Sequence, residues 1–123
     1  CHILYGEGGK LGPDLTGSGR ADLGYLLENI IDPSAIVPAE YRMTILNLKD
    51  GRSLTGVITS STNRTVNLRS LAEEATLEKS EITETSQPPN SIMPEGLISD
   101  LTPRQIRDLI AYLMHPQQVP LRK

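Results

Sequence analysis

Apolar positions in two stretches of the chain recur with the period of an amphipathic helix. Within residues 21–32 they fall near i, i+3, i+4, i+7 and i+8, and Pro33 ends the pattern. Residues 102–114 repeat this spacing behind Thr102, a good N-cap, and Gln105 completes a capping box. The sequence therefore predicts one helix in its first third and one near its end.

Between these helices the pattern changes to the alternation that is typical of strands. Asp50-Gly51 supplies the positive φ that a hairpin turn requires, and further turns are expected at 61–64 and 72–74. We expect residues 41–86 to form an antiparallel meander or a small barrel.

The composition fits one domain with an unusual core. A chain of 123 residues is long enough for one core, so residues 1–123 are expected to form a single domain that contains 41–86 as a β insertion. Aromatic residues make up only 3% of the chain, and Phe and Trp are absent. The centre of the core is therefore either supplied by another group, such as a porphyrin, or filled by Leu, Ile and Val.

Charge and hydropathy argue against several classes of function. The net charge is −3 and no run of Lys or Arg occurs, so nucleic acid is not an expected partner. The sequence holds no apolar stretch of membrane-spanning length and no secretory signal. No Ser/His/Asp, paired-carboxylate or phosphate-loop constellation is evident, so independent catalysis is not expected.

The first two residues carry candidate chemistry. Cys1-His2 is the second half of the C-x-x-C-H run that attaches haem c, in which the thiolate forms a thioether and the His is an axial iron ligand. Gly12-Pro13 suits such a site, because the Pro13 carbonyl can accept a hydrogen bond from His2 Nδ1 and fix its tautomer. The alternatives are a free thiol beside a solvated His, and a terminal metal site with too few further ligands.

A second candidate ligand lies shortly before the last helix. Met93-Pro94 follows the proline-rich stretch QPPNS, and these prolines would stiffen the loop that presents the Met93 thioether. The alternative is that Met93 is a packing residue in a surface loop.

Together these features resemble a class I cytochrome c. More narrowly, the chain is similar to the haem-binding domain at the C-terminus of large multidomain dehydrogenases of planctomycete-like bacteria. The matching stretches are GEGGKLGPDLTGSGRADLGYLLENIIDPSA, YRMTILNLKDGRSLTG and MPEGL. The resemblance implies an α+β fold, a cytochrome c-like helical haem shell with the β insertion inside it.

The resemblance also implies a site and a function. A covalently bound haem c would be attached through Cys1, with His2 and Met93 as the ligands of its iron. The remaining cofactor-binding residues would be Gly12, Pro13, Leu15, Leu27, Ile30, Leu109 and Leu113. Such a module transfers electrons, serves a redox partner protein or a dehydrogenase domain on the same polypeptide, and is periplasmic or otherwise exported.

A haem-free function remains the alternative. In that case the chain is a binding or structural domain, and the β insertion is its interaction surface. Absorbance at about 410 nm, where a c-type haem absorbs, would separate the two.

Overall fold

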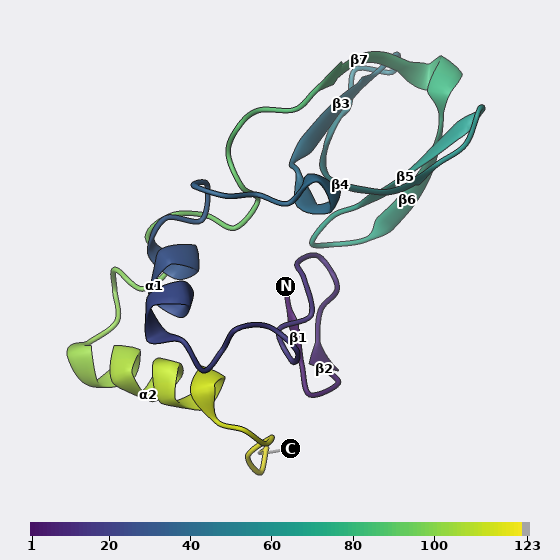
Figure 1. Ribbon diagram of the computed structural model, residues 1–123. Coiled ribbons are helices and arrows are strands. Elements are labelled where there is room, and N and C mark those ends of the chain that lie inside the picture. Colours follow the sequence, from purple (N-terminus) through teal and green to yellow (C-terminus); the bar gives the residue numbers. More distant parts are fainter. Residues whose placement is uncertain (122–123) are drawn as a thin grey trace. The chain divides into compact units, whose positions relative to one another are not determined.

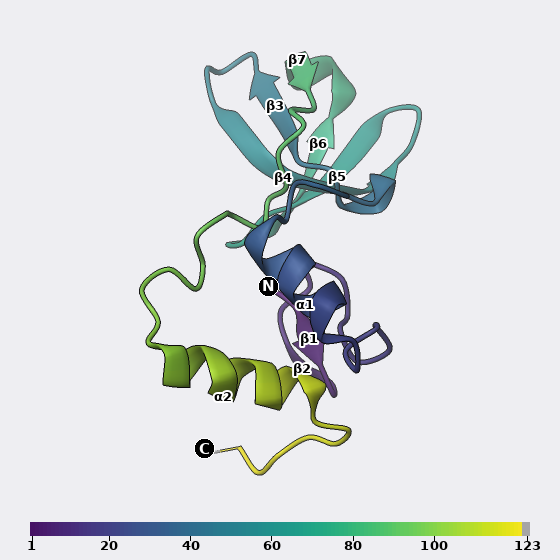
Figure 2. The same cartoon turned by 60° about the vertical axis from the view of Figure 1, so that its left-hand side comes forward.

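A computed structural model describes residues 1–121, and this part of the chain divides into two units. The first unit joins residues 1–36 to the segment that begins at Met93, and the second comprises Val37–Ile92. Figures 1 and 2 show the elements of both units from two directions.

The first unit begins with a short hairpin. Strand β1 (Ile3–Leu4) pairs antiparallel with β2 (Glu7–Gly8). The turn between them places Tyr5 at φ 51° and Gly6 at φ 83°. A positive φ is uncommon for a residue other than Gly, so Tyr5 depends on contacts elsewhere to hold it. Its backbone N–H donates to Thr16 Oγ1 at 2.8 Å, which ties the hairpin to the following loop.

Two α-helices complete the first unit. Helix α1 (Leu23–Ile31) starts where the Asp22 side chain accepts from the Tyr25 backbone N–H at 3.2 Å. Helix α2 (Pro103–Met114) starts with the predicted capping box, in which Thr102 and Gln105 each bond the other's backbone N–H. The helices contact each other, but α2 has no fully buried residue. The buried apolar side chains of this unit are Leu4, Leu11, Leu26 and Ile30.

The second unit is a five-stranded antiparallel sheet. Its strand order is β6-β5-β4-β3-β7, so β6 and β7 are the two edge strands. A 3₁₀ turn at Lys79–Glu81 connects these two edges, and the sheet curls strongly (Figures 1 and 2). The strands are β3 (Thr44–Leu48), β4 (Ser53–Ser61), β5 (Thr65–Arg69), β6 (Glu74–Glu78) and β7 (Ile82–Ser86).

The curl depends on β4, the longest strand. Its first half pairs with β3 and its second half pairs with β5. Gly56 lies where the two pairings meet, and a Cβ there would collide with the backbone carbonyl of Arg69. The register of β4 against β5 also shifts between Ile58 and Ser60. A glycine at a close backbone approach and a bulge are the usual means of bending a strand.

The hydrophobic cluster of the second unit is wholly aliphatic. Alternate residues of β3 and β5 point inward, as the burial of every second residue shows. The buried cluster comprises Leu46, Leu48, Val66 and Leu68, with Leu54, Ile58, Leu77 and Ile82 packed against it. The composition allowed a core centred on a group such as a porphyrin or a core filled by Leu, Ile and Val. The second unit has a core of the latter kind.

The predicted fold class is wrong, although several of its elements are placed well. Within residues 1–121 the structure has seven strands and two α-helices of nine and twelve residues, so it is mostly β and not a helical haem shell. The predicted helices and the strands within 41–86 are present, but β1 and β2 lie outside that range. The single domain with an insertion over 41–86 stays a prediction. No helix in the described part of the chain is long and apolar enough to cross a membrane.

The β3–β4 hairpin gives a prediction for pH. Asp50 Oδ1 accepts from the Arg52 backbone N–H at 3.0 Å and Oδ2 accepts from Arg52 Nε at 2.8 Å. These bonds favour the ionised form, so the pKa of the Asp50 carboxyl is lowered from its usual value. A lowered pKa in the folded state adds stability above the unfolded pKa of about 3.9, which is lost as the pH falls through the folded value.

We therefore expect Asp50→Asn to reduce the acid sensitivity of the second unit. Urea unfolding measured at neutral pH and again below pH 4 should show a smaller difference for the variant than for the wild type, because a side-chain amide does not gain a proton in this range. An unchanged pH dependence would contradict this role for the carboxylate.

Candidate functional site

Gly12 and Pro13 lie beside His2, as the sequence predicts. His2 Nδ1 donates to the Pro13 carbonyl at 2.8 Å, which confirms the predicted hydrogen bond. Gly12 lies against the imidazole, because a Cβ there would come within 2.6 Å of His2 Cε1. The backbone N–H of Gly12 also donates to the Cys1 carbonyl at 2.8 Å. The Gly12-Pro13 segment therefore holds the His2 ring, and the structure brings these three residues together.

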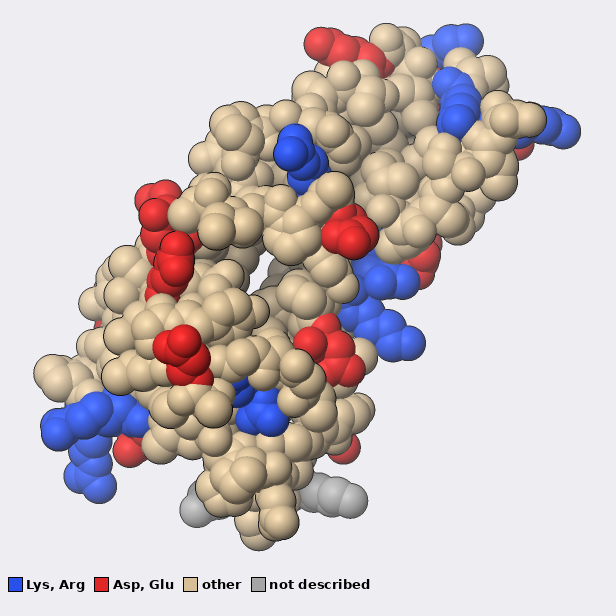
Figure 3. Space-filling model, in the orientation of Figure 1, with Lys and Arg blue, Asp and Glu red and all other residues tan. Residues whose placement is uncertain are grey.

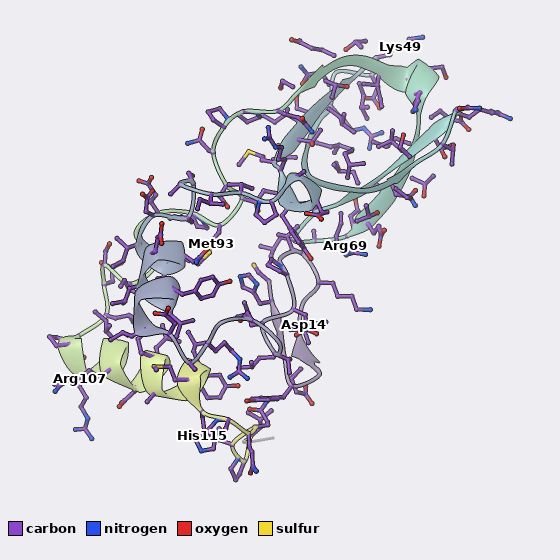
Figure 4. All side chains as sticks on the ribbon, viewed as in Figure 1. Asp14, Lys49, Arg69, Met93, Arg107 and His115 are labelled. Carbon is purple, nitrogen blue, oxygen red and sulfur yellow. The ribbon has the colours of Figure 1, made fainter. Side chains whose placement is uncertain are left out.

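The other predicted site residues also belong to the first unit. Ile30 is buried, Cys1 is exposed, and the remainder are half-buried, namely Leu15, Leu27, Met93, Leu109 and Leu113. Helix α1 carries Leu27 and Ile30, and α2 carries the last two leucines, and the two helices contact each other. Figure 4 labels Met93, which begins the second segment of this unit.

The second unit contains a feature that sequence reasoning did not find, a free sheet edge. Strand β6 pairs with β5 over Glu74–Glu78, and no other described strand pairs with its second side. The backbone N–H and C=O groups on that side are available to an added strand. An edge of this kind is the usual template for recognition of an extended peptide.

Side chains on the outer face of β6 are tied to its neighbours. Glu74 accepts from Arg69 Nη2 at 3.3 Å and from Thr59 Oγ1 at 3.0 Å, and Thr76 Oγ1 donates to Asn67 Oδ1 at 2.7 Å. Glu78 lies 3.9 Å from Arg64 Nη2. These contacts cross from β6 to β5 and β4. Exposed ion pairs of this kind contribute little free energy to stability.

A small pocket opens beside the start of β6. Its volume is about 160 Å³, and its lining residues are Ser53, Leu54, Thr55, Leu68, Ser70, Glu73 and Ala75. Leu54 and Leu68 also belong to the core of the unit, so the pocket reaches the apolar interior. Sites for small metabolites usually enclose roughly 300–1,000 Å³. This pocket is therefore of a size for one side chain rather than for a cofactor.

The turn from β5 to β6 forms one wall of the pocket and is held by three hydrogen bonds. Ser70 N and Ser70 Oγ donate to the Glu73 carbonyl at 2.8 and 3.0 Å, and Glu73 N donates to Ser70 Oγ at 3.2 Å. Leu71 at the tip of this turn is 77% exposed. Turn tips normally carry polar residues, so an apolar Leu71-Ala72 tip was the sequence signal that could have revealed this site. Figure 4 labels Arg69, the last residue of β5 before the turn.

Comparison with known proteins gives a likeness to solved structures and no match of another kind. No family model matches the chain. No curated protein matches it either. Among solved structures, the chain is similar to the pleiotropic translational regulator Hfq, at 18% sequence identity and a TM-score of 0.39. The match covers 58% of this chain and 97% of the Hfq chain.

The resemblance to a cytochrome c is wrong. Within residues 1–121 the chain forms seven strands and two short α-helices instead of a helical haem shell. Within residues 1–121, no group of three or more His, Cys, Asp or Glu side chains could hold a metal ion. The prediction of haem c and its iron is therefore wrong. The assignment of His2 and Met93 as ligands stays a prediction.

The findings favour the second of the two functions left open by the sequence. They back a haem-free binding or structural domain better than haem electron transfer.

Proposed function

We propose that the chain is a protein-binding domain whose second unit takes up an extended peptide segment along the free edge of β6. The observation that carries the proposal is this unpaired edge beside a side-chain-sized pocket. An added strand gains affinity from backbone hydrogen bonds and gains specificity from a pocket that receives one of its side chains.

Two further features support a peptide at this edge. The exposed Leu71 offers apolar contact to the end of an added strand, and the hydrogen bonds of the Ser70–Glu73 turn already fix its position. A preorganised surface loses less conformational entropy when its partner binds.

The charges of β6 disfavour pairing of this edge with itself. In an antiparallel pair of two β6 strands, Glu74 of one copy would lie near Glu78 of the other, and like charges opposite each other are destabilising. Glutamates on an edge strand are a common protection against self-association. A different segment with a complementary charge pattern is the better partner.

RNA is the rival partner, because the similar Hfq chain is described as a translational regulator. The charges of this chain do not favour it. On the face shown in Figure 3, basic and acidic side chains are interspersed, and the whole chain has a net charge of −3. Affinity for RNA rests mainly on Lys and Arg contacts to phosphates.

Nuclear magnetic resonance of the ¹⁵N-labelled chain tests the proposal. The probes are short blocked peptides that alternate threonine and valine and differ only in the central residue, which is lysine, norleucine, glutamate or alanine. At least one peptide should shift the amide signals of Glu74–Glu78 and Leu71 and leave those of α1 and α2 in place. Alternate backbone N–H groups of an extended peptide point to the same side, so two N-methylated versions of this peptide are made, one for each side. The version in which the N–H groups that face β6 are methylated should no longer shift the β6 signals, because its hydrogen bonds to the edge are blocked.

Three outcomes would contradict the proposal. The first is that no peptide shifts the β6 signals at millimolar concentration. The second is that shifts occur only in β7, the other edge strand. The third is that single-stranded RNA or a second copy of the chain, detected by sedimentation equilibrium, perturbs the β6 edge while the peptides do not.

A further inference from the structure

The chemistry of the β6 pocket narrows the class of peptide, provided that the proposed function holds. Three of its lining residues are apolar, namely Leu54, Leu68 and Ala75. The other four lining residues are polar, namely Ser53, Thr55, Ser70 and Glu73. A side chain that fits both parts has an aliphatic stem and a polar head.

The charge of Glu73 determines which polar end group of a bound side chain the pocket favours. Glu74 and Glu78 each have an arginine partner, Arg69 and Arg64. Glu73, by contrast, has no Lys or Arg within ion-pairing distance among residues 1–121. Glu73 is exposed and belongs to the lining of a partly apolar pocket, so its carboxylate is available to a cationic head.

We propose that the pocket receives a lysine side chain of the extended partner, with the stem on Leu54 and Leu68 and the ammonium group at Glu73. Lysine buries its four-carbon stem readily while its head stays in water. Its compact ammonium group has three donors, which suit a carboxylate and the neighbouring hydroxyls. The partner is thus a protein segment that carries a lysine within a stretch of β-forming residues.

The size of the pocket and the charge of the edge both agree with this choice. A cavity of about 160 Å³ has room for a side chain of this length but not for a folded element. A cationic segment also complements Glu73, the one of the glutamates at 73, 74 and 78 that has no arginine partner among the described residues. Complementary charges raise the rate of association and select against acidic partners.

The test compares peptides that differ by one group. The lysine and norleucine peptides share the same stem length and differ in the ammonium group, so their affinity ratio reports the contribution of the charge. Fluorescence anisotropy at low salt should show that the wild type binds the lysine peptide about fivefold more tightly, as a partly exposed ion pair would give. The glutamate peptide should bind more weakly than either.

Two matched variants assign the effect to the pocket. Glu73→Gln keeps the shape of the side chain and removes its charge, and it should abolish the preference for lysine over norleucine. Glu84→Gln removes the same charge from β7, the opposite edge, and should leave the preference intact. Both sites are exposed, so both variants should fold.

The outcomes separate this inference from the proposed function. Equal binding of the lysine and norleucine peptides, with β6 signals still shifted, would overturn the lysine assignment and leave the edge-binding function in place. Loss of the preference in Glu84→Gln to the same degree as in Glu73→Gln would also overturn it, because the effect would then be one of net charge. Absence of any shift in β6 would instead refute the proposed function.

Discussion

Leu46→Ala should lower the free energy of unfolding of the second unit by about 3 kcal/mol, within the range of roughly 2–5 kcal/mol for truncation of a buried leucine. Leu46 is 1% exposed and lies in β3, at the centre of the aliphatic cluster with Leu48, Val66 and Leu68. The deletion removes buried methyl groups and leaves a cavity that the paired strands β4 and β7 cannot readily collapse around.

Urea unfolding, followed by the amide signals of β3 to β7, measures this effect. Leu71→Ala is the matched control, because the same atoms are removed from a side chain that is 77% exposed. Its effect should be within about 0.5 kcal/mol, as for ordinary surface substitutions. A loss of less than about 1 kcal/mol for Leu46→Ala would show that this cluster is not the core of the unit.

Arg20→Met should have the largest effect on the first unit, a loss of about 2 kcal/mol. The guanidinium donates through Nη1 to the carbonyls of Leu113 and His115 at 2.7 and 3.0 Å. Through Nη2 it donates to Tyr5 Oη at 2.7 Å and to the Thr16 carbonyl at 3.0 Å. It also lies 4.8 Å above the centre of the Tyr5 ring. One side chain thus connects the first hairpin and its loop to the last turn of α2.

The effect depends on the shape of the guanidinium as well as its charge. Arg20→Lys keeps the charge but cannot reach four acceptors from a single nitrogen, so it should recover less than half of the lost stability. Arg107→Met is the control, because Arg107 is exposed and its Nε lies 3.4 Å from the Pro103 carbonyl on the same helix. If Arg20→Met lowered the free energy of unfolding no more than Arg107→Met, the hydrogen bonds of Arg20 would not be what stabilises the first unit.

Local signals in the sequence predicted the local structure. The Thr102 capping box and the Asp50-Gly51 turn are encoded within a few residues, and both are present. The hairpin of β1 and β2 was missed because each strand has two residues and its turn needs a positive φ at Tyr5, which sequence rules disfavour.

Features that depend on residues far apart in the sequence could not be predicted from such local signals. The Cys1-His2 and Met93-Pro94 pairs are short motifs, and the resemblance built on them led to the wrong cofactor. The His2–Pro13 hydrogen bond shows that local geometry can be right while the inferred chemistry is wrong, because it requires only a turn at Gly12-Pro13. The β6 pocket is assembled from β4, β5 and β6 through their pairing, so its lining residues share no sequence signal.

Amide hydrogen exchange of Glu74–Glu78 tests the proposed use of this edge most directly. Backbone N–H groups on a free strand edge exchange readily with water, whereas those bonded to an added strand are protected. With saturating lysine peptide, the outward amides of β6 should exchange at least about tenfold more slowly, while β7 amides keep their rates. Unchanged exchange in β6 with peptide bound, or protection confined to β7, would contradict strand addition at this edge.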